Sequence, residues 1–208
     1  MDANRILDLL EELYPEAGAE LRFSNPFETL IATILSAQCT DKRVNTVTEP
    51  LFREFPDASS LLALSQEELE ERIKTCGLYR MKAKNILSAC RALVDGCGGE
   101  VPADREKLMA LPGVGRKTAG VVLMAAFGDD QIPVDTHVFR VTNRIGLAEA
   151  DTANETERQL RQALLRRQEA RLRTLPARGS GSVPGVPHRE LRGQTKGELK
   201  ACHCLWMW

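Results

Sequence analysis

The segment LPGVGRKTA, from Leu111 to Ala119, holds the residues best suited to chemistry in this chain of 208 residues. Pro112 fixes the entry, and Gly113 and Gly115 permit backbone conformations and close approaches that a side chain would block. Amide N–H groups that point outward together at the start of a helix can bind a phosphate. On DNA, such a hairpin would grip the backbone without reading base sequence. Taken alone, this pattern is more often a tight turn between helices.

An amine and a carboxylate accompany the hairpin, at Lys117 and Asp135. A lysine amine can attack C1′ of a nucleotide, displace the base and form a Schiff base, after which β-elimination breaks the strand 3′ to the lesion. The amine must be neutral when it attacks, and a partly desolvated helix N-terminus beside Arg116 favours that form. Asp135 can take up a proton or stabilise positive charge on the sugar. The structural alternatives are a phosphate-binding or solvated lysine and a simple helix N-cap.

Helices are the elements that must position these residues. Asn25 followed by Pro26 predicts an N-cap and a first-turn proline, and Ser65 with Glu68 predicts a capping box. We expect Asp41 to cap a further helix. The predicted helices are a first one ending at Pro15, then 26–38, 41–55, 65–76, 81–94, 104–110, 116–127 and 136–146. No alternating pattern is long enough to build a sheet, so the predicted fold class is all-α.

Four ordered motifs resemble the endonuclease III family of helix-hairpin-helix DNA glycosylases. They are SAQCTD at 36–41, GLYRMKAKNI at 77–86, LPGVGRKTA at 111–119 and VDTHVFRVTNRIGL at 134–147. The resemblance covers about residues 1–160 and implies two helical domains with a DNA-binding cleft between them. Residues 20–130 would form the six-helix-type domain with the hairpin. Residues 1–19 and 131–165 would form the second domain, an incomplete remnant of the family's iron–sulfur domain.

The resemblance also assigns roles to single residues. Lys117 matches the catalytic lysine of the family and Asp135 its catalytic aspartate. Gln38 would fill the hole left by an extruded nucleotide, and Leu78 would act as a wedge in the opposite strand. Base extrusion costs a few kcal/mol, so such groups are needed. The other expected DNA contacts are Lys82, Leu111, Gly113, Gly115, Arg116 and Arg140.

The implied activity is removal of oxidised pyrimidines from damaged double-stranded DNA, followed by AP lyase cleavage. One alternative is a monofunctional adenine glycosylase, although that relative lacks a lysine at the position of Lys117. Another is a non-catalytic or inactivated helix-hairpin-helix DNA-binding protein. We expect a monomer in the bacterial cytoplasm, associated with the nucleoid and not with a membrane, because the N-terminus lacks signal-peptide features and no apolar run is long enough to cross a bilayer.

The C-terminal part differs in composition from the rest of the chain. Residues 1–157 hold 17 basic and 26 acidic residues, whereas residues 158–208 hold 11 and 3. A local basic stretch from Arg72 to Arg91 nevertheless interrupts the acidic part. Beyond Arg166 the sequence is rich in Gly, Pro and Ser without hydrophobic periodicity, so we predict a disordered tail outside the family over 166–208. This abrupt change suggests a shifted reading frame near residues 160–170.

The cysteines do not provide an iron–sulfur site. Family members usually hold a [4Fe–4S] cluster through C-x6-C-x2-C-x5-C, but this tail contains only Cys202 and Cys204. No cofactor is therefore predicted for this chain. The other cysteines, at 39, 76, 90 and 97, are predicted to be inert free thiols. Loss of the C-terminal helices would leave Leu7, Leu10 and Leu13 without partners, which predicts an unstable or aggregation-prone polypeptide.

Overall fold

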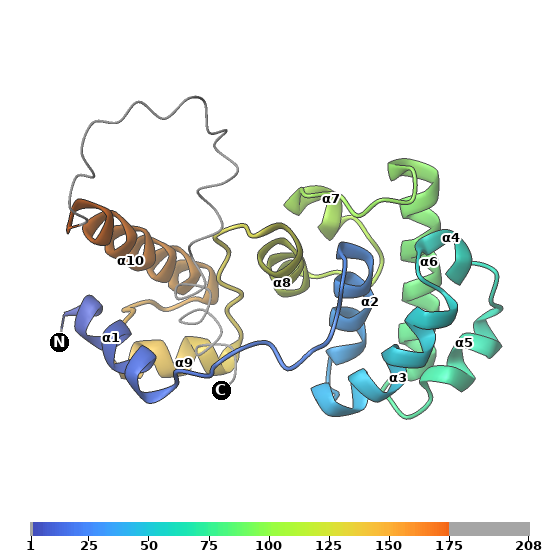
Figure 1. Ribbon diagram of the computed structural model, residues 1–208, viewed down its shortest axis with the longest axis horizontal. Coiled ribbons are helices and arrows are strands. Elements are labelled where there is room, and N and C mark those ends of the chain that lie inside the picture. Colours follow the sequence, from blue (N-terminus) through green and yellow to red (C-terminus); the bar gives the residue numbers. More distant parts are fainter. Residues whose placement is uncertain (1, 175–208) are drawn as a thin grey trace, which may run out of the picture. The chain divides into compact units, whose positions relative to one another are not determined.

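The computed structural model describes residues 2–174, with side chains as far as residue 170, and its regular elements there are all helices, as predicted (Figure 1). They are α1 (Ala3–Leu13), α2 (Pro26–Ser36), α3 (Asp41–Glu54), α4 (Ala58–Leu61), α5 (Gln66–Ile73), α6 (Tyr79–Cys97), α7 (Arg105–Met109), α8 (Arg116–Phe127), α9 (Thr136–Arg144) and α10 (Ala153–Thr174). None of these helices is long and apolar enough to cross a membrane.

The chain separates into two compact units. Among the described residues, the first combines 2–19 with 134–174, and the second is the continuous segment Glu20–Pro133. We call them the split unit and the hairpin unit. The boundary expected after residue 130 falls three residues before the observed one. Lys117 therefore belongs to the hairpin unit, and Asp135 begins the return of the chain to the split unit.

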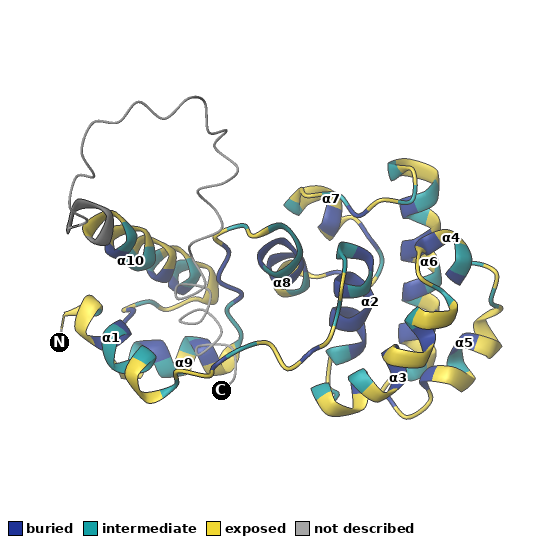
Figure 2. Ribbon diagram, in the orientation of Figure 1, coloured by how far each residue is buried: buried dark blue, intermediate teal, exposed yellow. Residues whose placement is uncertain are grey.

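Helix α2 lies at the centre of the hairpin unit. The side chain of Asn25 accepts a hydrogen bond from the Glu28 amide at 2.9 Å, and Pro26 occupies the first turn, as the sequence predicts. All the helix residues from Phe27 to Leu35 are buried except Glu28, so almost every face of α2 is covered (Figure 2). Helices α3, α6 and α8 pack against it. Helices α3, α6 and α8 are thus held by one core.

Local capping signals set several helix boundaries. Ser65 and Glu68 form the predicted capping box at the start of α5. Helix α8 begins at Arg116 and ends at Phe127, as expected. The prediction for Asp41 is wrong, because Thr40 occupies the N-cap position of α3 and Asp41 lies in its first turn. The carboxylate of Asp41 is therefore available for a role other than capping.

The split unit corrects two expectations about the C-terminal part. The segment 166–174, predicted to be disordered, continues α10 as a helix. Arg167 is buried in this helix, and its Nη2 donates to Asp8 Oδ1 at 2.7 Å and to Glu11 Oε2 at 2.9 Å on α1. Leu7 is also buried, with 1% of its surface exposed, so it does not lack partners, whereas Leu13 is 67% exposed. The rest of the predicted tail lies outside the described residues.

Candidate catalytic and DNA-binding site

The hairpin between α7 and α8 is held at fixed points. Leu111 and Val114 are buried. Gly113, which lies between them, and Gly115, which follows Val114, are exposed. Gly113 has a φ of +80°, and a Cβ atom there would lie 2.9 Å from Asn85 Cβ on α6. Both the backbone angle and the space therefore require glycine at this position. The exposed backbone that results is suited to close approach by a phosphate.

Lys117 lies in the first turn of α8, directly after this hairpin, and is exposed together with Arg116. Two cations and the N-terminus of a helix are thus presented on the same part of the hairpin unit. The sequence led us to expect partial desolvation at Lys117, whereas the structure leaves this residue exposed.

Asp41 is a candidate residue that the sequence analysis treated only as a helix cap. It is half-buried, and burial raises the pKa of its carboxyl above the ordinary value of 3.8. The negative charge of Glu20 adds to this increase in pKa, while the positive charge of Lys117 opposes it. The hairpin unit therefore brings a carboxyl group into the electrostatic neighbourhood of the lysine. The sequence feature that could have singled out Asp41 is its position as the last residue of the SAQCTD motif.

Asp135 is the N-cap of α9 in the split unit. Its Oδ1 accepts hydrogen bonds from the amides of His137 at 2.9 Å and Val138 at 2.8 Å. Asp135 therefore caps helix α9, which is the structural alternative that the sequence analysis considered for it. Because the residue is only half-buried, it also retains solvent contact. Arg140 is exposed on the same helix, with Nη2 3.5 Å from His137 Nδ1.

Gln38 and Leu78 both adopt the left-handed backbone conformation that non-glycine residues rarely use. Their φ angles are 53° and 58°, and both side chains are exposed, Leu78 by 62%. Leu78 is therefore not a core residue of this unit. The two turns lie side by side, since a Cβ at Gly77 would be 3.2 Å from the carbonyl oxygen of Gln38. Such strain is typical of functional positions.

The expected DNA contact of Lys82 needs correction. Its side chain is buried, with 4% of the residue exposed, and Nζ donates a 2.8 Å hydrogen bond to the carbonyl oxygen of Leu35. Burial lowers the pKa of this lysine. The ammonium group caps the end of α2 from within the hairpin unit. Lys82 therefore has a structural role and does not present its charge to a phosphate in this arrangement.

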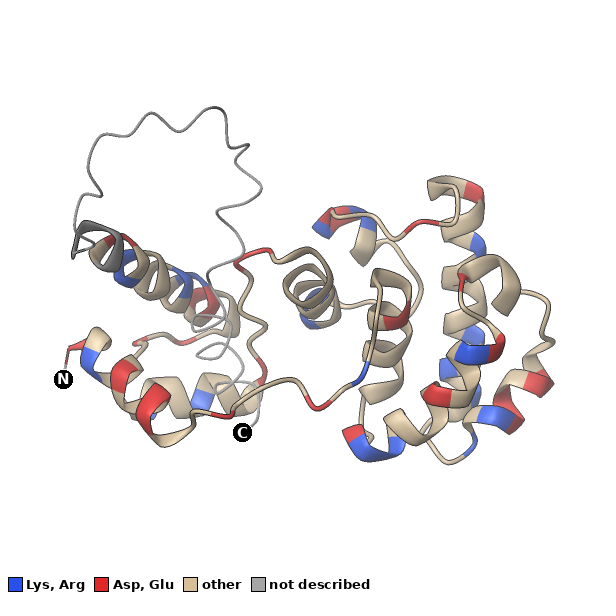
Figure 3. Ribbon diagram, viewed as in Figure 1, with Lys and Arg blue, Asp and Glu red and all other residues tan. Residues whose placement is uncertain are grey.

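The surface of α6 remains basic without Lys82. Arg80, Lys84 and Arg91 are exposed on this helix, and its only acidic residue is Asp95 near the C-terminal end (Figure 3). Exposed Met81 lies in the same first turn, close in sequence to Leu78. This part of the hairpin unit combines positive charge with exposed apolar side chains, as single-stranded and distorted nucleic acids require.

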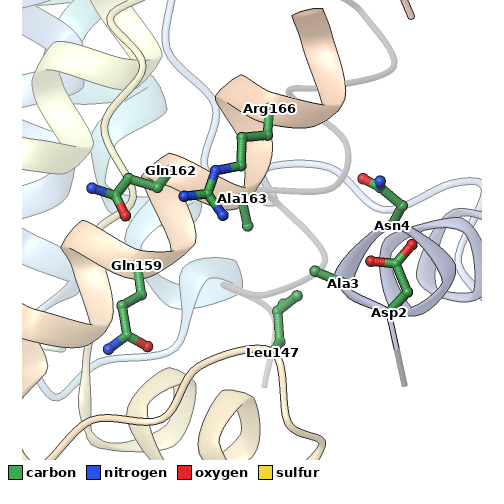
Figure 4. A pocket seen from close by; sticks show the side chains of 8 residues that line it. All are labelled: Asp2, Ala3, Asn4, Leu147, Gln159, Gln162, Ala163 and Arg166. Atoms are coloured by element: carbon green, nitrogen blue, oxygen red, sulfur yellow. The ribbon is translucent and has the colours of Figure 1, made fainter. Parts of the chain in front are cut away.

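The split unit contains a separate cavity of about 280 Å³. Gln159, Gln162 and Arg166 from α10 line it on one side, and Asp2, Ala3 and Asn4 lie opposite (Figure 4). None of the residues predicted for catalysis or DNA binding lines this cavity. Among residues 2–174, no group of three or more His, Cys, Asp or Glu side chains is placed to hold a metal ion.

Comparison with known proteins agrees with the helical hairpin and the residues around it. Residues 31–166 match the family described as HhH-GPD superfamily base excision DNA repair protein. The chain is thus a helix-hairpin-helix base excision repair protein. It is 50% identical over 155 residues to endonuclease III of Bacillus subtilis, covering 74% of this chain and 71% of the relative. Endonuclease III of Escherichia coli K12 has the same identity over 155 residues, which are 74% of each chain.

Solved structures show the same relationship. A trapped covalent intermediate of endonuclease III with DNA has a TM-score of 0.76 and 39% identity, covering all of this chain and 86% of that one. A non-covalent endonuclease III–DNA complex gives the same values. The chain belongs to the endonuclease III family, whose function is base excision repair by DNA glycosylase and AP lyase activity.

Proposed function

We propose that this protein removes oxidised pyrimidines from damaged double-stranded DNA and cleaves the resulting abasic site, with Lys117 as the nucleophile. The observation that carries this proposal is the exposed amine in the first turn of α8, directly after the glycine hairpin. The trapped DNA complex of a relative that is 39% identical is described as a covalent intermediate, which supports a nucleophile in the same fold.

In this mechanism Lys117 attacks C1′ of the extruded nucleotide, and the C1′–N bond to the base breaks. The C1′–O4′ bond of the sugar ring then breaks, O4′ takes up a proton, and an iminium results. The iminium acidifies the C2′ proton, and loss of that proton by β-elimination breaks the C3′–O bond. Asp135 stabilises the positive charge on the sugar as the base departs. The raised pKa of Asp41 makes this carboxyl a second candidate for holding a proton near the lysine.

The same proposal assigns the DNA grip to the hairpin and the two strained turns. Backbone amides of Gly113 and Gly115 hold a phosphate, assisted by the charge of Arg116, while Arg140 adds a contact from α9. Gln38 enters the space left by the extruded nucleotide, where its amide can donate to and accept from the orphaned base. Leu78, which is largely exposed, supplies the apolar wedge.

Borohydride reduction of the Schiff base tests the role of Lys117. Wild-type protein incubated with an abasic-site duplex should give a covalent adduct, and Lys117→Ala should give none. Lys107→Ala is the matched control, because Lys107 is an exposed lysine on α7 of the same motif. A wild-type protein that binds this duplex in a salt-dependent way but yields no adduct would be a binding module, and the proposed lyase activity would be wrong.

Asp135→Asn separates the charge of this residue from its capping role. Asparagine caps helices about as well as aspartate, so the hydrogen bonds to α9 and the thermal stability should be retained. Base release should fall by roughly 10²-fold or more, the scale on which a single electrostatic group contributes to catalysis. Equal rates for both proteins would leave Asp135 with only its helix-capping function.

The residues of this chain do not fit an iron–sulfur cluster, and we propose that it acts without one. The family match ends at residue 166, and only Cys202 and Cys204 follow it. Two thiolates cannot supply four ligands. Iron analysis of the purified protein tests this proposal, and stoichiometric iron would overturn it. Sequencing of codons 155–175 in all three frames tests whether a shifted frame replaced the family's C-terminus.

We also propose a cytoplasmic monomer that contacts DNA and no membrane. Relatives solved in complex with DNA support the nucleic-acid partner. Mass measured in solution by light scattering tests the monomer, and a dimer at micromolar concentration would contradict it.

A further inference from the structure

A pair of cysteines lies beneath the two strained turns. Cys39 directly follows Gln38, and Cys76 comes two residues before Leu78. The turns are in contact, because a Cβ at Gly77 would lie only 3.2 Å from the Gln38 carbonyl oxygen. The Cys39 side chain lies close enough to Cys76 to raise the pKa of the Cys76 thiol. Two thiols from segments 37 residues apart thus lie near each other, next to the turns whose side chains are assigned to the DNA.

The surroundings of the two thiols differ. Cys76 is buried and Cys39 is partly exposed. Burial, together with the charge and hydrogen bond of Cys39, raises the pKa of Cys76 to about 11. The ammonium of Lys82 lies near the Cys76 sulfur and stabilises negative charge on it. Cys39 is therefore the thiol that an oxidant in solution reaches first, and Cys76 is the buried partner beside it.

We propose that Cys39 and Cys76 form a reversible disulfide under hydroperoxides, and that this bond deforms the turns that carry Gln38 and Leu78. The Cys39 thiolate attacks the peroxide, its sulfur bonds to one oxygen as the O–O bond breaks, and water leaves after protonation. The Cys76 sulfur then attacks the sulfenic sulfur, and the Cys76 thiol proton goes to the departing hydroxyl, which leaves as the second water. Two thiols and one hydrogen peroxide give one disulfide and two water molecules.

The geometry limits how the turns can accommodate this bond. The sulfur atoms of a disulfide are about 2.05 Å apart, which is closer than two hydrogen-bonded thiols. The turns already approach each other closely, since a Cβ at Gly77 would lie 3.2 Å from the Gln38 carbonyl oxygen, and Gln38 and Leu78 both have left-handed backbones. We expect drawing the sulfurs together to shift backbone dihedrals at Gln38 or Leu78. The disulfide then changes the placement of at least one of the two inserting side chains.

Peptide mapping of the full chain tests the bond itself. Trypsin releases Cys39 in the peptide 23–42 and Cys76 in the peptide 75–80. After treatment with hydrogen peroxide, these peptides should be linked in wild-type protein with the loss of two hydrogen atoms, and dithiothreitol should separate them. The link should be absent in Cys39→Ser and in Cys76→Ser but present in Cys97→Ser, a matched control on α6. Oxidation of Cys39 to sulfinic acid without any link would overturn the proposal.

Hydrogen exchange of the same samples tests the deformation without relying on the proposed activity. Amide exchange should change in the peptides that contain residues 36–41 and 76–80 of oxidised wild-type protein, and not in Cys39→Ser. Unchanged exchange in a fully linked protein would refute the effect on the turns. The effect on DNA rests on the proposed function, and there we expect roughly tenfold weaker binding to an abasic-site duplex.

Discussion

Substitution of Gly113 by alanine is the most direct test of how the hairpin is built. The backbone φ of Gly113 is +80°, and an L-residue in the left-handed region costs about 1–2 kcal/mol. The new Cβ would also lie 2.9 Å from Asn85 Cβ and 3.0 Å from Asn85 Nδ2. The amide of Asn85 can rotate away, but its Cβ is fixed to the backbone of α6.

The second contribution is therefore an overpacking cost of about 1–3 kcal/mol. Together, the two effects predict that Gly113→Ala lowers the free energy of unfolding by roughly 2–5 kcal/mol. Asn85→Ala in the same chain should recover only part of this loss, because it removes the contact with Nδ2 and keeps the contact with Cβ.

Gly115→Ala is the matched control in the same loop. Its φ is −91°, and nothing lies within 4 Å of the position of a Cβ. The gain from a less flexible unfolded chain offsets the poorer N-cap, so a change within about 0.5 kcal/mol is expected. Urea unfolding measures both variants. Equal stability of the Gly113 and Gly115 variants would refute the account of the hairpin.

Three further predictions concern charged side chains. Arg167→Ala should destabilise the protein by about 2–3 kcal/mol, which is less than the loss expected for a fully buried ion pair because the Asp8 side chain is half exposed. Arg158 is exposed, so Arg158→Ala should leave the urea midpoint unchanged. Asp41→Asn should raise the melting temperature relative to wild type, but only at pH values above the ordinary pKa of 3.8. The folded protein raises the pKa of Asp41, so ionisation of this carboxyl disfavours folding as the pH rises from 3.8 through the pKa of the folded state. Melting curves from about pH 3 to pH 8 measure this difference. Arg116→Ala should reduce the number of counterions released on duplex binding by about one, which appears as a smaller slope of log K against log salt concentration. Lys82→Met should leave this slope unchanged, and salt titrations of binding measure both.

The helix boundaries could be predicted where their causes are local. Asn25, Ser65 and Asp135 each bond to an amide two or three residues away, so short sequence windows contain both partners. The all-α class follows from the same windows. Prediction failed where the partner is distant. Arg167 pairs with Asp8, 159 residues earlier, and composition alone indicated disorder for a segment that continues α10.

The site residues show the same limit. Lys117 and the hairpin glycines could be identified because the motif is contiguous in sequence. The burial of Lys82 was partly predictable, since it lies four residues before buried Ile86 on one face of α6, but its bond to the Leu35 carbonyl was not. Asp41 gains its unusual environment from Glu20 and Lys117, which only the folded chain brings near it.

The left-handed turns at Gln38 and Leu78 have a consequence for engineering of this protein. Glycine would relax either turn, so a selection for heat resistance alone would favour glycine at both places. The resulting variants would be more thermostable, but they would lack the amide group of Gln38 and the isobutyl group of Leu78. A screen for heat resistance should therefore be paired with a screen for DNA repair, because at these two positions the residue that favours stability differs from the residue that the proposed activity needs.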